Sequence, residues 1–195
     1  MSFMSRLTEQ ALQVDSLLCV GLDPHPRDLD ESTADAARDF CLRLIDATVG
    51  LALAYKPNAA FFELYGAEGS SALRQVIDYA RKAGMVILDS KRGDIAATAE
   101  AYAQAGFETY GANALTVNPY LGWDALEPFL RDPDRGVFLL CKTSNPGSGD
   151  LQDLQVVGKG RFETLYERVA RLAEGWNDHD NLGLVVGATH PQALE

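Results

Sequence analysis

The sequence predicts an α/β fold, a (β/α)8 TIM barrel of which about six βα units are present in this chain. Short apolar runs alternate with amphipathic helical segments along the chain, as expected for parallel strands joined by helical crossovers. Nearly every predicted strand ends in polar residues, which a barrel gathers around one mouth. The first βα turn, at residues 21–26, lacks the Gly-x-Gly-x-x-Gly pattern of a dinucleotide-binding open sheet. A barrel is therefore favoured over an open sheet.

Six strands are predicted from apolar runs that are bounded by turn residues. They cover residues 17–23, 53–58, 85–91, 114–118, 137–143 and 182–188. Helical patterns separate them at residues 32–48, 70–83, 94–110, 124–130 and 161–176. Asp94 is expected to cap the third of these helices and Gly111 to end it.

We expect one barrel domain over residues 1–195 that is incomplete at its C-terminal end. No low-complexity linker divides the chain. A closed (β/α)8 domain usually needs about 250 residues, and six strands cannot close a ring of eight. Residues 190–195 resemble the opening of a helix. The chain is therefore interpreted as a fragment of a barrel, or as a chain whose barrel is completed by residues outside it.

Composition narrows the classes of function. A formal net charge of -11 argues against binding to nucleic acid or to an anionic membrane, although a few placed cations can still bind an anionic small molecule. No secretory signal is recognisable, and the apolar runs are shorter than the roughly 20 residues of a membrane span. Cys19, Cys41 and Cys141 are odd in number, which favours reduced thiols. A soluble, cytoplasmic protein is predicted.

The strongest candidate site follows the buried strand at residues 85–91. Because side chains alternate along a strand, Asp89 and Lys91 are expected on one side. Asp94 begins the next helix and is expected to converge with them, so that Lys91 lies between two carboxylates. Lys56, from the preceding strand, adds a second ammonium group. Charge at such strand ends is typical of catalytic sites in barrels. The alternative is a structural salt bridge with Asp94 as an ordinary helix cap. The polar strand ends are Asp23, Lys56 with Asn58, Asp89 with Lys91, Asn118, Lys142 with Ser144, and Thr189 with His190.

Several motifs in order along the chain carry a resemblance to a known family. They are Gly21-Leu22-Asp23-Pro24, Tyr55-Lys56-Pro57-Asn58, the Asp-x-Lys-Arg-x-Asp-Ile-x-x-Thr string at residues 89–98, the segments at residues 116–122 and 142–148, and Val186-Gly187-Ala188-Thr189. In these motifs the chain resembles the orotidine 5'-phosphate decarboxylases, in particular their longer bacterial (type 2) subfamily. The resemblance implies decarboxylation of orotidine 5'-monophosphate to uridine 5'-monophosphate in de novo pyrimidine biosynthesis, with no cofactor.

The resemblance also implies catalytic roles. Lys91 is matched to the lysine that protonates C6 of the pyrimidine as carbon dioxide leaves. Asp89 would lie beside the departing carboxylate, and Lys56 would hold both residues and touch the ribose. Asp94 is matched to the catalytic aspartate that the family places in the neighbouring subunit's site.

Substrate contacts are implied in the same way. Asp23 is matched to a ligand of the ribose hydroxyls and Ser144 to the serine that reads the pyrimidine edge. Asn58 and Asn118, at two further strand ends, are additional candidates.

Ile95 and Thr98 belong with Asp94 to the segment that would complete the neighbouring site. A homodimer is therefore implied. In the family a turn after the seventh strand and an arginine after the eighth hold the substrate phosphate, and neither has a counterpart here. We therefore expect little or no activity from this chain alone.

Two other functions stay open from the sequence. A magnesium-dependent sugar-phosphate decarboxylase or aldolase of the same barrel group shares the Asp-x-Lys-x-x-Asp string, but needs further carboxylates to hold the metal. A non-catalytic remnant would bind nucleotide weakly or serve as an assembly partner. His25, His179 and His190 are scattered without ligand spacing, so no metal site is expected.

Overall fold

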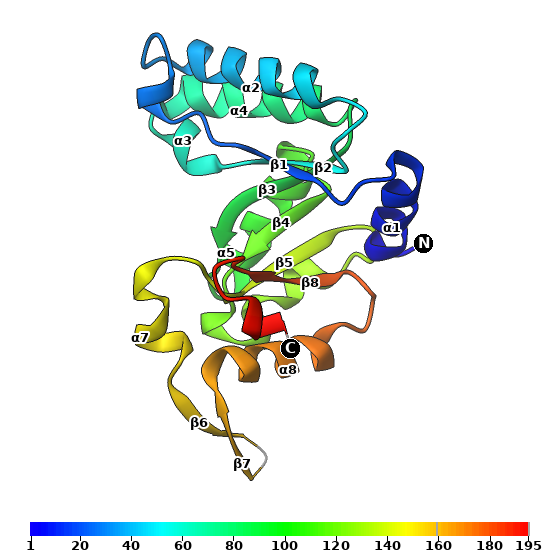
Figure 1. The fold of residues 1–195 in the computed structure, drawn as a ribbon, viewed down its shortest axis with the longest axis vertical. Helices are drawn as coiled ribbons and strands as arrows, with labels where there is room; N and C mark the ends of the chain where they lie inside the picture. The colour runs from blue at the N-terminus through cyan, green and yellow to red at the C-terminus, as the bar shows by residue number, and fades with distance from the viewer. Residues whose placement is uncertain (159, 195) are drawn as a thin grey trace.

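The computed structural model describes residues 1–158 and 160–194, and its main feature is a curved parallel sheet. The strand order is β1-β2-β3-β4-β5-β8, and every neighbouring pair is parallel (Figure 1). The strands are β1 Cys19–Leu22, β2 Ala54–Pro57, β3 Met85–Arg92, β4 Ala114–Val117, β5 Gly136–Lys142 and β8 Leu182–Val186. All six predicted strands are therefore present, and they form part of a TIM barrel. β1 and β8 are the outer strands of this sheet in the described part of the chain.

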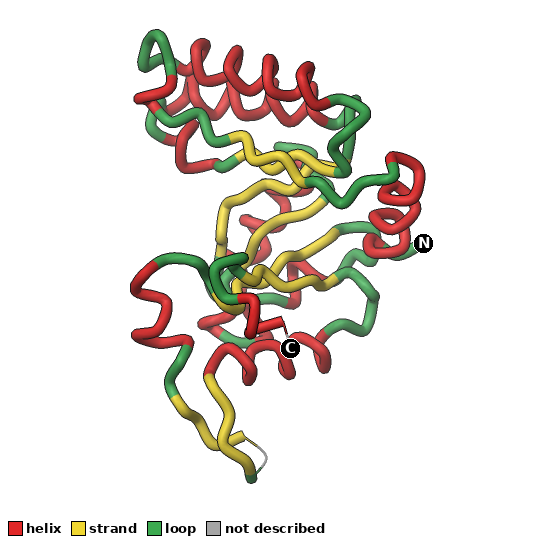
Figure 2. The backbone as a smooth tube through the Cα atoms, in the orientation of Figure 1, coloured by secondary structure: helices red, strands yellow, loops and turns green. Residues whose placement is uncertain are grey.

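Helices connect the strands and cover the outer face of the sheet (Figures 1 and 2). They are α1 Phe3–Val14, α2 Ala34–Thr48, α3 Ala59–Glu63, α4 Gly66–Ala80, α5 Ala96–Gln104, α6 Glu127–Leu130, α7 Gly149–Gln152 and α8 Leu165–Trp176. A π-helical turn, Ala105–Thr109, continues α5. None of the helices in the described residues combines the length and the apolar character that crossing a membrane requires.

Two apolar clusters hold this architecture together. The larger lies between the strands and their helices and includes the fully buried Phe62, Ile77 and Leu139. The smaller closes the N-terminal ends of the strands, where Phe3 of α1 packs among residues of β2, β3 and β4. Phe3 is completely buried, and burial of such a side chain stabilises a fold by about 1.5–3 kcal/mol. A Cβ atom at Gly136 would lie within 2.4 Å of the Phe3 ring, so this approach requires glycine.

Several element boundaries differ from the prediction. Residues 161–164 were expected to begin a helix, but Arg161–Thr164 forms β7, which pairs with β6 (Gln155–Gly158) in an antiparallel hairpin. Figure 1 shows this hairpin extending away from the main sheet. α8 begins only after Thr164, which forms a capping box with Glu167. That pair satisfies the backbone amides of Thr164 and Glu167 and fixes the boundary.

Candidate active site

The candidate active site lies at the C-terminal ends of β2 and β3. Asp89 Oδ2 is 3.0 Å from Lys56 Nζ, and Asp89 Oδ1 is 2.6 Å from Lys91 Nζ. The Asp89 side chain is only 8% exposed, whereas that of Lys91 is 50% exposed. The sequence was interpreted as a lysine between two carboxylates. The structure instead shows a buried carboxylate between two ammonium groups.

Electrostatics keep the central carboxylate ionised. Burial by itself raises the pKa of Asp89, but hydrogen bonds from Lys91 and Thr116 and the charge of Lys56 outweigh this effect. The pKa of Asp89 therefore lies below its ordinary value of 3.8. A fixed negative charge at this position holds the two ammonium groups in place. The site thus presents two pre-oriented cations at the mouth of the barrel.

Asp94 does not join this array, which corrects the expectation that it converges with Asp89 and Lys91. Its Oδ1 accepts a hydrogen bond from the Ile95 amide at 2.8 Å, and among the described residues it forms no ion pair with Lys91. It is also not the helix cap, because α5 begins after Ile95. Ala96, the first residue of α5, has a left-handed backbone with φ 44°, and this turn starts the helix two residues later than predicted.

The predicted substrate-binding residues of the first two strands lie next to the array. Asn58 Nδ2 donates a hydrogen bond to Asp23 Oδ1 at 3.0 Å. The Asn58 backbone forms an isolated parallel bridge with Asp89. Its side-chain oxygen also accepts from the Ala60 amide and caps α3. Asp23 is exposed, and its second carboxylate oxygen, Oδ2, lies beside Gly21, because a Cβ atom there would be 2.7 Å from it.

Asn118, at the end of β4, is an exposed residue with a structural contact. Its side-chain oxygen accepts a hydrogen bond from the Tyr120 amide at 3.0 Å and starts a 3-10 turn at Pro119–Leu121. Gly93 lies against it, since a Cβ atom there would be 3.2 Å from Asn118 Cβ. The contact places the residue after β3 beside the end of β4.

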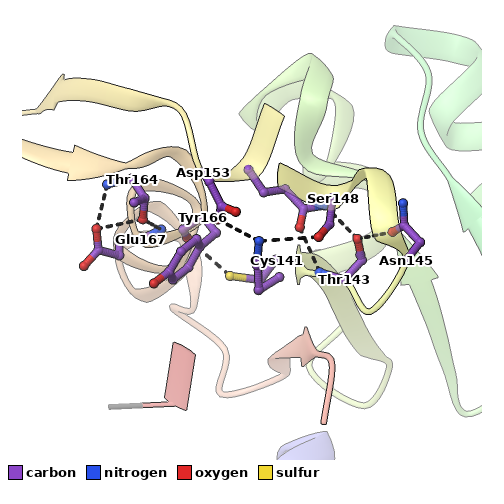
Figure 3. Close-up of polar contacts among 10 residues, drawn as sticks. Cys141, Thr143, Asn145, Ser148, Asp153, Thr164, Tyr166 and Glu167 are labelled. Carbon is purple, nitrogen blue, oxygen red and sulfur yellow. Dashed lines mark hydrogen bonds and ion pairs between the residues drawn. The ribbon is translucent and has the colours of Figure 1, made fainter. Parts of the chain in front are cut away.

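Ser144 lies two residues after β5, in a loop that side chains hold at its base (Figure 3). The Thr143 amide donates to Gln152 Oε1 at 2.9 Å, and Gln152 Nε2 donates to Thr143 Oγ1 at 2.8 Å. Thr143 Oγ1 also bonds Asn145 Oδ1 at 2.6 Å. Ser144 itself is exposed and makes no hydrogen bond with the Lys56, Asp89 and Lys91 array among the described residues.

Lys142, which the sequence grouped with the polar strand ends at the mouth, is buried instead. Its side chain is 4% exposed, and its Nζ lies 2.7 Å from Asp153 Oδ1 and 3.4 Å from Ser148 Oγ. Figure 3 shows Asp153 and Ser148 on the segment that follows β5. Lys142 therefore anchors this segment, and it contributes no free cation to the mouth.

Sequence reasoning missed Thr116, in the middle of β4. The residue is 3% exposed, and its hydroxyl bonds Asp89 Oδ1 at 2.8 Å. The available signal was a hydroxyl residue within the otherwise apolar run of residues 114–117.

No group of three or more His, Cys, Asp or Glu side chains suited to a metal occurs among the described residues. The expected absence of a metal stays a prediction.

Comparison with known proteins agrees with the motifs. Residues 16–195 match the model of the "Orotidine 5'-phosphate decarboxylase / HUMPS family". The orotidine 5'-phosphate decarboxylase of Roseiflexus castenholzii is 54% identical over 198 residues, which span all of this chain and 71% of the relative. That of Variovorax paradoxus is 48% identical, over all of this chain and 73% of the relative.

Solved structures agree in fold. The structure of Leishmania donovani OMP decarboxylase has a TM-score of 0.89 and 55% identity, over all of this chain and 74% of that chain. The putative orotidine-monophosphate-decarboxylase of Toxoplasma gondii has a TM-score of 0.92 and 40% identity, over 99% of this chain and 73% of that chain. The chain belongs to the orotidine 5'-phosphate decarboxylase / HUMPS family.

Proposed function

We propose that this chain carries the catalytic array for the decarboxylation of orotidine 5'-monophosphate to uridine 5'-monophosphate in pyrimidine biosynthesis. The observation that carries the proposal is the buried Asp89 carboxylate held between Lys56 and Lys91 at the barrel mouth. Identity of 46–54% to relatives named orotidine 5'-phosphate decarboxylase, over the whole chain, supports it. These names do not favour the magnesium-dependent alternative.

The chemistry requires a proton donor and fixed charge. When the bond between C6 and the carboxylate breaks, its electron pair stays on C6 and carbon dioxide leaves. Lys91 Nζ would donate the proton that quenches this carbanion. Its half-exposed ammonium group can reach a bound ligand, while Asp89 fixes its position. Because the charges are already oriented, little reorganisation is needed as negative charge develops.

We also propose the substrate contacts that the motifs implied. Asp23, oriented by Asn58, would bind the ribose hydroxyls through its exposed carboxylate. Ser144 would read the pyrimidine edge from the loop after β5. This loop would have to bring Ser144 toward the array when substrate binds. Asn118 would line the mouth between them.

A homodimer is part of the proposal. Asp94, Ile95 and Thr98 lie at the start of α5 without contributing to the array of their own chain, and Ile95 and Thr98 are exposed. They are therefore available to a second copy. In the chimera described below, which adds the missing part of a relative, mixing the inactive variants Lys91→Ala and Asp94→Ala would restore turnover, because a mixed dimer contains one site with both native residues. Absence of restored activity, with a monomer in sedimentation, would contradict the shared site.

A direct test compares two forms of the protein. The chain spans 71% of the Roseiflexus castenholzii relative, and its sheet leaves β1 and β8 as outer strands. We expect little turnover of orotidine 5'-monophosphate by the 195-residue chain. We expect clear turnover by a chimera that adds the part of the relative beyond the matched region.

The comparison has outcomes on both sides. A chimera that folds but neither turns over the substrate nor binds uridine 5'-monophosphate would contradict the proposed function. Full turnover by the 195-residue chain would contradict the expected loss. Activity that disappears with a chelator and returns with Mg²⁺ would favour the metal-dependent alternative.

A further inference from the structure

The pairing between β3 and β4 changes register at the catalytic residues. Leu88 lies opposite Leu115, and Arg92 lies opposite Val117. From the first of these pairs to the second, β3 advances by four residues and β4 by two, so β3 carries two extra residues. A bulge of this kind bends a strand and redirects its side chains. Asp89 and Lys91 both lie inside the bulge.

The bulge leaves backbone amides of β3 without their regular partners on β4, and the Thr116 side chain takes that place. Thr116 Oγ1 accepts hydrogen bonds from the Ser90 amide at 3.0 Å and from the Lys91 amide at 2.9 Å. It donates its own hydrogen to Asp89 Oδ1 at 2.8 Å. A hydroxyl has one donor and two acceptor positions, and all three are used here.

The backbone held by these bonds is an uncommon one. Lys91 has φ 46°, in the left-handed region that residues other than glycine seldom adopt. Such a conformation persists only where surrounding contacts impose it. The Ser90 hydroxyl does not supply such a contact, since its oxygen is buried without a hydrogen-bond partner among the described residues. The Lys91 amide bonds Thr116 directly, so the Thr116 side chain supplies a contact at the turn itself.

We propose that Thr116 is a positioning residue of this active site. Its hydroxyl holds the bulge of β3 in the left-handed turn at Lys91 and orients the Asp89 carboxylate, so that the Lys91 ammonium is presented at the mouth. The catalytic part of this inference rests on the proposed function. The structural part does not. Thr116 acts through Asp89 and Lys91 and does not itself need to touch the substrate.

Substitutions of Thr116 can distinguish this role from ordinary packing. Thr116 lies between Leu115 and Val117 in a buried strand. Valine has nearly the same shape as threonine, so a purely packing role would be preserved by Thr116→Val. The positioning role would be lost in that variant and retained in Thr116→Ser. These two variants therefore separate the hydroxyl from the volume.

Amide hydrogen exchange of the 195-residue chain, measured by NMR, tests the structural part. Thr116→Val is expected to speed exchange of the Ser90 and Lys91 amides by about 10-fold or more, since a bond worth ~1.4 kcal/mol corresponds to that factor. Thr116→Ser should stay within about threefold of the wild-type rates. Thr8→Val is the matched control, because the exposed Thr8 hydroxyl bonds the Met4 carbonyl within α1, away from the site. If Thr116→Val prevents folding, Thr116→Cys serves as the second variant.

Steady-state turnover tests the catalytic part. It is measured in the form of the protein, the chain or the chimera, whose wild type is active. Thr116→Val should lower kcat by about 10- to 100-fold, the scale of a small misplacement of a reacting group. KM should change less than about threefold, and Thr116→Ser should restore kcat. Unchanged exchange and unchanged kcat in Thr116→Val would overturn the inference. Altered exchange, together with no turnover by the wild-type chain or by the folded wild-type chimera, would uphold the positioning of Lys91 and reject the proposed function instead.

Discussion

The ends of β3 and β5 both carry a lysine paired with an aspartate, and the two pairs are buried in opposite ways. In β3 the carboxylate of Asp89 is 8% exposed and the Lys91 side chain is 50% exposed. In β5 the Lys142 side chain is 4% exposed and that of Asp153 is 52% exposed. The role of each pair depends on which of its two side chains is exposed. Lys91 can contact a ligand, whereas Lys142 makes its contacts within the protein.

The surroundings of the two buried groups explain this difference. Asp89 receives bonds from Lys56, Lys91 and Thr116, which come from three neighbouring strands. A buried charge needs such partners to offset the loss of water. Lys142 finds its partners in the segment that follows its own strand. They are Asp153 and Ser148. The ring of Tyr166, in helix α8, also lies near Lys142, with its centroid 5.7 Å from Nζ.

The largest expected effect would come from the exposed lysine of β3. In the chimera, Lys91→Ala should lower turnover of orotidine 5'-monophosphate by about 10²- to 10⁴-fold, the usual contribution of a general acid. It should lower the free energy of unfolding by only about 1 kcal/mol, because the buried Asp89 carboxylate keeps its bonds with Lys56 and Thr116. Steady-state kinetics and urea titration of the same samples measure both quantities. Lys82→Ala, at an exposed lysine after α4, is the control. Retained turnover in Lys91→Ala would remove the catalytic assignment.

The next effect concerns the buried lysine of β5. Asp153→Asn should lower the free energy of unfolding by about 2–4 kcal/mol, because it leaves a buried ammonium group without its counter-charge. The double variant Lys142→Met with Asp153→Asn should recover at least half of that loss, since methionine buries no charge. Asp150→Asn, on an exposed carboxylate of helix α7 just before Asp153, is the matched control. Equal losses for Asp153→Asn and Asp150→Asn would show that Lys142 does not need its partner.

A pH dependence is expected at the buried carboxylate of β3. The pKa of Asp89 is lower in the folded protein than its ordinary value of 3.8. Its contribution to stability is therefore present above about pH 4 and is lost as the pH falls through the folded pKa. Asp89→Asn should cost about 1–3 kcal/mol of unfolding free energy at pH 7 and less at pH 3. Urea unfolding at the two pH values measures this, and a cost that grows at pH 3 would reverse the assigned direction.

The smallest expected effect uses a cysteine as a reporter beside Lys142. Burial raises the pKa of Cys141, and its Sγ donates to the Tyr166 carbonyl at 3.3 Å. Asp153→Asn should speed labelling of Cys141 several-fold at pH 8, since the segment after β5 loosens. Cys41, whose pKa burial raises to about 12, should keep its rate. Labelling resolved by mass spectrometry measures both thiols, and equal acceleration of Cys41 would indicate general unfolding instead.

Local pattern was sufficient for much of this protein. Apolar runs of four to eight residues between turn signals predict buried strands, and all six predicted strands lie in the parallel sheet. The expectation that Asp89 and Lys91 lie together with Lys56 is confirmed, although a bulge in β3 and not regular alternation places Lys91. These features depend on short-range periodicity and on parallel strands sharing one end, so a single sequence contains them.

Only the tertiary structure decided how the charges are used. The bulge that Thr116 stabilises depends on pairing between two strands, which no pattern within β3 reveals. The burial of Lys142 depends on a segment that folds back from residues 148–153. The hairpin β6–β7 replaced a predicted helix start because its residues pair with one another across a turn. Periodicity indicates which side of an element a residue faces, whereas register and burial arise from contacts between elements. Those contacts leave Lys91 exposed at the mouth and bury Lys142.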